Sequence, residues 1–496
     1  MDGQLVDGER HDDEYSPAIG PVNGENHTKI RRRQIKPDRF AHECARGWFD
    51  VANPPAFTLR RRARAAFFSS VFTMKFHSGK IRGLRWYIVA LLALASELNY
   101  LDRQALSVLA QTIQDELGFT TIEYSYITSA FLTSYTVMYL VSGRLVDWLG
   151  SRKSFSIFVS GWSLATMLHF FARTPFQFAS CRFLLGATEP ANFPAGVKAV
   201  SEWFPLRERA LAVGLFNAGT AVGAGLAAPL VSLVALTLGW RWAFVITGGL
   251  GLVWVLIWRR WYHLPQDHPH LSAEERTLIL DGQPADQAPE PMMPWAQILR
   301  LRATWACVVA RMLTDPVTYF FIFWTPKYLQ QEQGFNLADI GKFSWIPFVA
   351  LALGNVCGGL VPNRLVRRGW TVNRARKTTM LVSSLAMPVL CFTIARTATP
   401  GLALGCMSLA MFFHAAWANM TLPAELLPSR AIGSVTGLAG AMGGVMGILS
   451  QTAIGWTVQH LSFTPVFAAA AFMHLTAFLG VTLLAGRIGQ QPQAAR

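Results

Sequence analysis

The chain has 496 residues, of which 52% are hydrophobic and only 15% are charged. Soluble domains carry about 25% charged residues, so this composition indicates a membrane-embedded protein and excludes a string of ordinary soluble domains. The formal net charge of +15 would suit a nucleic-acid-binding protein, but the basic residues lie in the N-terminal tail and in alternate loops. That distribution is typical of a membrane protein, and we expect no nucleic-acid partner.

Residues 1–80 form a polar, Arg- and Pro-rich segment without helical periodicity. The segment lacks the apolar core and the cleavage site of a secretory signal, so we expect a disordered, basic, cytoplasmic tail. A second interpretation is that translation starts at Met74 and that the preceding residues are not translated. The sequence leaves both interpretations open.

Twelve apolar segments follow, each about 20 residues long, which is the length that crosses a bilayer as a helix. We expect an N-terminal six-helix bundle over residues 85–262 and a C-terminal six-helix bundle over residues 301–487, separated by a polar central loop at 263–300 and followed by a short tail at 488–496. The predicted spans are 86–110, 122–145, 154–172, 177–200, 210–234, 241–262, 303–328, 340–362, 377–396, 400–422, 431–457 and 463–485.

Loop charge predicts the orientation of these spans. The tail, alternate loops, the central loop and the C-terminus are basic, whereas the intervening loops are poor in Arg and Lys. Both termini should therefore be cytoplasmic. We expect a multi-pass monomer in the lipid bilayer of a bacterial inner membrane.

The two halves resemble each other in the same chain direction. Gly118-Phe119 precedes the second span and Gly334-Phe335 precedes the eighth, and a Pro-x-Arg sequence follows both the fourth and the tenth spans. Each match is weak alone, but matches in corresponding loops indicate two parallel six-helix repeats. Glycines also recur in the fifth and eleventh spans, which are equivalent helices, and they predict close helix contacts there.

The loop after the second span reads Gly143-Arg-Leu-Val-Asp147-Trp-Leu-Gly150-Ser-Arg152-Lys153. It resembles the signature of the major facilitator superfamily, G-x-L-x-D-x-x-G-x-[RK]-[RK]. The resemblance implies an all-α membrane protein with twelve transmembrane helices in two pseudo-symmetric six-helix bundles. We expect Gly143, Asp147, Arg152 and Lys153 to form a conformational latch, with Asp147 pairing across the bundle interface. The alternative is a solvated turn.

Two further motifs narrow the resemblance. Asn99-Tyr-Leu-Asp102-Arg103-Gln104 in the first span and Arg182-x₆-Glu189 in the fourth resemble the anion:cation symporter family within that superfamily. The sequences Arg-Met-Leu-Thr-Asp-Pro and Trp-Thr-Pro-Lys-Tyr-Leu in the seventh span look most like the hexuronate (galacturonate/glucuronate) transporters. The resemblance covers about residues 85–488.

Ionisable side chains inside the spans need an explanation, because each costs about 2.5–3.5 kcal/mol near a helix centre. Any single one could belong to a structural ion pair, but a bundle does not need the whole set in order to pack. Arg182 and Glu189 lie two turns apart on one helix face, and Asp102 and Arg103 point about 100° apart. The intramembrane charges are Asp102, Arg103, Arg182, Glu189, Arg311 and Asp315.

The resemblance implies a role for four of these charges. Asp102 and Glu189 match the proton-coupling carboxylates, and Arg103 matches the arginine that binds the substrate carboxylate. Arg182 matches an arginine that pairs with the glutamate and reaches the substrate. Arginine suits this task because it stays charged and binds carboxylates bidentately. A substrate that competes for the arginine would leave the glutamate to accept a proton.

Other polar residues are candidates for substrate binding: Tyr135, Asn217, His414, Trp417 and Asn419. Tyr135 could also be a packing tyrosine, and His414 a packed core histidine. Arg311 and Asp315 are four residues apart and form a possible pair.

The sequence motifs given above do not indicate an enzyme. The sequence has no Walker loop, HExxH motif or CxxC pair, so we expect no cofactor, metal site or disulfide, and a proton gradient as the energy source. We predict proton-coupled symport (uptake) of an organic anion, a hexuronate such as galacturonate or glucuronate, by alternating access. The alternatives are a same-family carrier for aldonate, aldarate or an aromatic acid, and a non-transporting nutrient sensor on a transporter fold.

Overall fold

A computed structural model describes residues 80–281, 293–417 and 421–488. The predicted tail and Met74 lie outside the described residues. The described part of the first half is helical, with these elements: α3 (Leu84–Leu117), α4 (Thr121–Leu168), α5 (Pro175–Thr188), η2 (Glu189–Ala191), α6 (Asn192–Trp203), α7 (Leu206–Leu238) and α8 (Trp240–Trp261).

The described part of the second half is also helical, and two short helices precede it within the predicted central loop. The loop helices are α9 (Ala273–Asp281) and α10 (Trp295–Arg300). The helices of the second half are α11 (Arg302–Gln331), α12 (Leu337–Phe343), α13 (Ile346–Arg367), α14 (Val372–Arg396), α15 (Pro400–Ala416), α16 (Leu422–Leu426), α17 (Ser429–His460) and α18 (Thr464–Ala485).

Four predicted spans differ from single straight helices. The second and third spans run together in α4, which turns at Gly150, whose φ of 75° favours glycine. The fourth span breaks at η2, where Pro190 lacks the N–H that an unbroken α-helix would use. The eighth span is divided between α12 and α13. The break at η2 has a functional consequence, because Glu189 lies in it.

Among the described residues, seven helical segments are long and apolar enough to cross a membrane by length and composition alone. Several others are apolar but carry charges or end early: α3 contains Glu97, Asp102 and Arg103, and α15 is 17 residues long. Together with the family described below, these helices confirm the predicted twelve-span fold, in which α4 supplies two spans and α5–η2–α6 supplies one.

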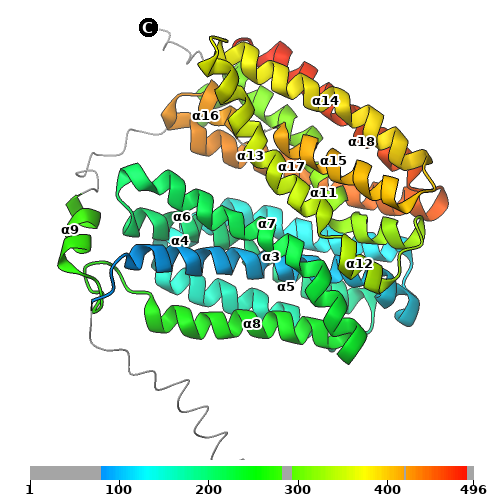
Figure 1. Ribbon diagram of the computed structural model, residues 1–496, viewed down its shortest axis with the longest axis horizontal. Helices are drawn as coiled ribbons and strands as arrows, with labels where there is room; N and C mark the ends of the chain where they lie inside the picture. Colours follow the sequence, from blue (N-terminus) through cyan, green and yellow to red (C-terminus); the bar gives the residue numbers. More distant parts are fainter. Residues whose placement is uncertain (1–79, 282–292, 418–420, 489–496) are drawn as a thin grey trace, which may run out of the picture. The chain divides into compact units, whose positions relative to one another are not determined.

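The helices form two bundles, one from each half of the chain (Figure 1). Within the bundles, α3 packs on α7 and the equivalent α11 packs on α17. Between the bundles, α4 packs on α17 and the equivalent α13 packs on α7. This reciprocal packing is the arrangement expected of two parallel repeats.

Hydrogen bonds join the two bundles at the end of the molecule where α3 ends and α4 begins, which we call the far side. Lys327 is fully buried, and its ammonium donates to the side-chain oxygen of Gln114 and, at 2.9 Å, to Thr121 Oγ1. The hydroxyl of Tyr124 donates to the carbonyl of Phe323 at 2.8 Å. These contacts between α3 or α4 and α11 close the far side.

At the opposite end, which we call the tail side, α9 contacts the start of α3. The carboxylate of Glu275 accepts hydrogen bonds from the backbone N–H groups of Leu84 at 3.1 Å and Arg85 at 3.3 Å, and from the Arg85 guanidinium at 2.7 Å. A carboxylate at a helix N-terminus satisfies otherwise unpaired N–H groups and favours the helix dipole. The central loop is therefore attached to the first half.

Glycine allows close contact between α7 and α3. A Cβ added at Gly223 would lie 2.1 Å from the backbone oxygen of Glu97, whereas one added at Gly225 would meet nothing within 4 Å. We expect Gly223→Ala to lower the free energy of unfolding by about 1–3 kcal/mol, because the backbones must separate. Thermal unfolding in detergent measures this effect, and Gly225→Ala is the matched control. Equal unfolding temperatures for the two variants would contradict the prediction.

Candidate functional site

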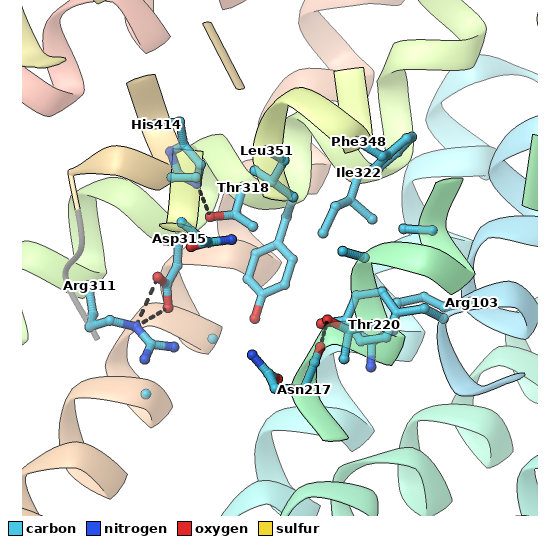
Figure 2. Close-up of a pocket in the computed structure, with 18 of the residues that line it drawn as sticks. Arg103, Asn217, Thr220, Arg311, Asp315, Thr318, Ile322, Phe348, Leu351 and His414 are labelled. Carbon is cyan, nitrogen blue, oxygen red and sulfur yellow. Dashed lines mark hydrogen bonds and ion pairs between the residues drawn. The ribbon is translucent and has the colours of Figure 1, made fainter. Parts of the chain in front are cut away.

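A cavity of about 400 Å³ lies between the two bundles (Figure 2). Side chains from α3, α4 and α7 form one wall, and side chains from α11, α13, α14, α15 and α17 form the other. This volume lies within the usual range for small-molecule sites, about 300–1,000 Å³. Because the far side is closed, the cavity extends toward the tail side, where Gly359 and Arg376 contribute to its lining.

Arg103 lines one wall of the cavity and forms an ion pair with Glu189, which is buried beside it. Arg103 donates through Nε and Nη2 to Oε2 of Glu189, at 2.9 and 2.7 Å. The second carboxylate oxygen, Oε1, is buried without a hydrogen-bond partner among the described residues. The rings of Tyr100, Phe131 and Tyr135 surround the guanidinium carbon, with centroids at 4.5, 5.4 and 4.9 Å. These π faces stabilise the arginine's charge in a buried place.

The identity of the arginine that pairs with Glu189 corrects the sequence analysis. The sequence predicts Arg182, but the structure pairs Glu189 with Arg103. Arg182 is buried and donates from Nη1 to the backbone carbonyl of Arg103 at 3.1 Å. The prediction is wrong because it assumed an unbroken helix, whereas the turn at η2 changes the direction of Glu189. Arg182 therefore supports the backbone of α3 from behind the cavity wall.

Asp102 points away from the cavity, in contrast to Arg103, as their angular separation predicts. Its side chain is buried, and neither carboxylate oxygen has a hydrogen-bond partner among the described residues. The hydroxyls of Thr166 and Thr247 and the guanidinium of Arg182 are its polar neighbours, and none of them meets hydrogen-bond geometry with it. An unpartnered carboxylate in this position is costly as an anion and far less so as a neutral acid.

A second ion pair lies on the opposite wall of the cavity, which confirms the possible pair of the sequence analysis. Arg311 Nε donates to Asp315 Oδ1 at 2.9 Å and to Oδ2 at 2.7 Å, within α11 (Figure 2). One turn on, the Thr318 hydroxyl lies 2.8 Å from His414 Nε2. His414 Nδ1 in turn lies 2.9 Å from Nε2 of His474, which the sequence analysis missed.

The remaining predicted substrate residues fall into three groups. Tyr135 and Asn217 line the cavity. Trp417 is buried in the second bundle, where its indole donates to Ser384 Oγ at 2.9 Å, so its ring is committed to packing. Asn419 lies outside the described residues. Substrate contact by any of them stays a prediction.

Sequence reasoning missed several polar residues of the cavity: Gln104, Tyr139, Tyr319 and Asn355. Helical spacing could have found two of them, because Tyr139 lies one turn beyond Tyr135 and Tyr319 lies one turn beyond Asp315. The two tyrosines of α4 also stack, with ring centroids 6.2 Å apart.

The predicted latch residues make contacts within the first half. The carboxylate of Asp147 is 77% exposed and lies 3.1 Å from the ammonium of Lys198. Arg152 donates to the backbone oxygen of Arg259 at 2.8 Å, Lys153 is exposed, and a Cβ on Gly143 would meet nothing within 4 Å. A contact of Asp147 across the bundle interface stays a prediction for another conformation.

Two pseudo-symmetric helix bundles around a polar cavity with buried charge pairs define a membrane transporter. The chain belongs to the Major Facilitator Superfamily, whose family model matches residues 92–451. This membership confirms the family resemblance found in the sequence.

Curated relatives narrow the class further. The chain is 34% identical over 401 residues to the hexuronate transporter of Escherichia coli (strain K12). This alignment covers 80% of this chain and 93% of that protein. The chain is 39% identical over 313 residues to the galacturonate transporter of Dickeya chrysanthemi, covering 62% of this chain and 90% of that one. A D-galactonate transporter of Escherichia coli is 31% identical, covering 82% and 96%. The protein is thus a multi-pass membrane transporter of organic acid anions and not an enzyme.

A solved structure shares the fold. The bacterial homologue of the human lysosomal transporter Spinster superposes with a TM-score of 0.63 at 16% sequence identity, covering 82% of this chain and 96% of that one.

Proposed function

We propose that the protein is a proton-coupled symporter that takes up a hexuronate, such as galacturonate or glucuronate, across a bacterial inner membrane by alternating access. The observation that carries this proposal is the ion pair of Arg103, which lines the cavity, with Glu189, which is buried beside it. The arginine of this pair can bind a substrate carboxylate, and its glutamate can accept a proton.

Substrate and proton binding are coupled through competition for one guanidinium. A substrate carboxylate that binds the fork of Arg103 displaces Glu189, which then loses its only hydrogen-bonded cation among the described residues. A buried carboxylate without a partner is stabilised by taking up a proton. The proton on Glu189 then offsets the negative charge of the bound substrate, so the net charge of the cavity is the same as in the empty carrier when the bundles reorient.

Asp102 is a second candidate for carrying a proton. It lies behind the cavity wall, next in sequence to Arg103, and its oxygens have no hydrogen-bond partner among the described residues. A neutral acid suits this site better than an anion. We propose that Asp102 takes up a proton from the cavity, and that its change of charge alters how α3 packs on α8.

The closed far side supports an inward-facing assignment. If the termini are cytoplasmic, as loop charge predicts, the cavity opens to the cytoplasm. Outward opening would then break the contacts of Lys327 and Tyr124 and bring the tail-side ends of the bundles together. In that state Asp147 would be able to contact the second half.

Uptake by the purified full chain in proteoliposomes tests the proposed function. With an inward proton gradient, labelled galacturonate should accumulate above its external concentration, and a protonophore should abolish the accumulation. A panel with glucuronate, galactonate, galactarate and an aromatic acid identifies the substrate class. Binding without any uptake would favour a sensor, and accumulation that ignores the proton gradient would contradict the coupling.

A further inference from the structure

The cavity has two charged poles, of which the proposed function uses one. The first pole is Arg103–Glu189, contributed by α3 and η2 of the first half. The second pole is Arg311–Asp315, contributed by α11 of the second half, and Figure 2 shows it across the cavity from Arg103. The second pole has no role in proton coupling as proposed above.

The two poles differ in how their carboxylates are bonded. Glu189 uses one oxygen for its arginine and leaves the other without a partner among the described residues. Asp315 accepts the single Nε–H of Arg311 with both oxygens, at 2.9 and 2.7 Å. The two partners of this pair are four residues apart on one helix, whereas Arg103 and Glu189 lie on different helices. The second pole is therefore a local feature of α11 and moves with that helix as one unit.

The surrounding helix makes room for the paired aspartate. A Cβ added at Gly443 of α17 would lie 2.2 Å from Asp315 Oδ2 and 3.3 Å from the backbone oxygen of Arg311. A larger residue at this position would push the carboxylate out of its place. Because residue 443 is a glycine, the Arg311–Asp315 pair can both lie against α17 and border the cavity.

The second pole offers hydrogen-bond donors and acceptors without net charge. A guanidinium donates, a carboxylate accepts, and the neighbouring Thr318 hydroxyl, which His414 orients, has a further lone pair that can accept. A sugar hydroxyl complements this set because it can donate to Asp315 and accept from its neighbours. A second substrate carboxylate can only accept, so it would have to displace Asp315 from Arg311 and leave one of the two carboxylates without its cation.

One small molecule can contact both poles. Tyr319, one turn beyond Asp315 on α11, lines the cavity together with Arg103, Arg311 and Asp315. The arginines of both poles therefore border one cavity, whose volume of about 400 Å³ suits a single small molecule.

We propose that Arg311 and Asp315, with Thr318 and His414, form a hydroxyl-binding subsite for the end of the sugar acid remote from its carboxylate, and that Asp315 excludes acids with a second carboxylate. The inference rests on the proposed function for the first carboxylate. It makes Asp315 a specificity-determining residue that selects monocarboxylic sugar acids over dicarboxylic ones.

Two acids with the same carbon skeleton test the inference. Galacturonate carries a hemiacetal carbon where galactarate carries a second carboxylate. In proteoliposomes with the full chain, unlabelled galactarate should compete with labelled galacturonate at least about 100-fold more weakly than galacturonate itself. Asp315→Asn keeps the size and one acceptor oxygen but removes the charge, and it should reduce this preference to about tenfold or less.

Glu116→Gln is the control. Glu116 is a carboxylate that pairs with a different arginine, Arg241 at 2.6 Å, at the far-side end of α3 and outside the cavity. Its substitution should leave the preference at the wild-type value. If Asp315→Asn transports galacturonate with an unchanged preference, the inference is overturned, whereas a wild type that transports neither acid overturns the proposed function instead.

The wild type alone provides a second measurement if Asp315→Asn fails to fold. Cyclohexanecarboxylate has the carboxylate and the ring but no hydroxyls, so it should compete at least about 100-fold more weakly than galacturonate, since several hydrogen bonds are lost. Equal competition by cyclohexanecarboxylate, or by galactarate, would overturn the hydroxyl-binding subsite.

Discussion

Arg103→Ala is expected to weaken binding of the acid by about 100-fold, because the substrate carboxylate loses a charge-assisted, two-pronged partner. Titration calorimetry of the detergent-purified protein with galacturonate measures the dissociation constant directly. The expected loss depends on the position of Arg103 on the cavity wall, where three aromatic rings hold its guanidinium.

Arg103→Lys separates the effect of charge from that of geometry. Lysine still offers Glu189 a cation, so the variant should fold, but an ammonium cannot present two parallel N–H groups to one carboxylate. We expect an intermediate loss of affinity, about tenfold. Thermal unfolding without substrate checks that both variants are folded. An alanine variant that is folded and binds the acid with unchanged affinity would place the carboxylate site elsewhere.

Glu189→Gln is expected to abolish uphill accumulation while sparing exchange of labelled for unlabelled substrate across the membrane. The amide imitates a protonated glutamate, so it releases Arg103 to the substrate but can no longer take up or deliver a proton. Initial rates of counterflow should also depend less on pH than in the wild type. Proton-driven uptake and counterflow, measured in the same proteoliposome preparation, give the two readouts.

The control for this variant is Glu116→Gln. Glu116 also pairs with an arginine, Arg241 at 2.6 Å, but it lies at the far-side end of α3, outside the cavity. Its amide variant should accumulate substrate as the wild type does. Gradient-driven accumulation that survives in Glu189→Gln would remove this residue from the coupling role.

Much of the fold followed from local sequence signals. The apolar segments and the two sets of corresponding loops predicted two bundles, because span length and repeated turns are properties of short stretches. The i,i+4 spacing likewise predicted the pair of Arg311 and Asp315, which the structure contains.

The contacts that define the site depend on tertiary structure and were harder to predict. The partner of Glu189 was assigned by assuming one continuous helix, but Glu189 begins a short 3₁₀ turn that includes Pro190 and redirects the carboxylate toward α3. Trp417 was placed in the cavity from its neighbours in sequence, yet its indole finds Ser384 on another helix. The direction of a side chain around a kinked helix is set by packing, which sequence spacing does not record.

The contact of α9 with α3 determines which part of the central loop moves with the first bundle. Because Glu275 bonds the first residues of α3, the central segment as far as Asp281 should travel with the first bundle. A pair of spectroscopic probes on α8 and α9 should then report a constant separation when substrate is added. A pair on α9 and α16 should report a change, and the first pair supplies the internal reference for measuring it.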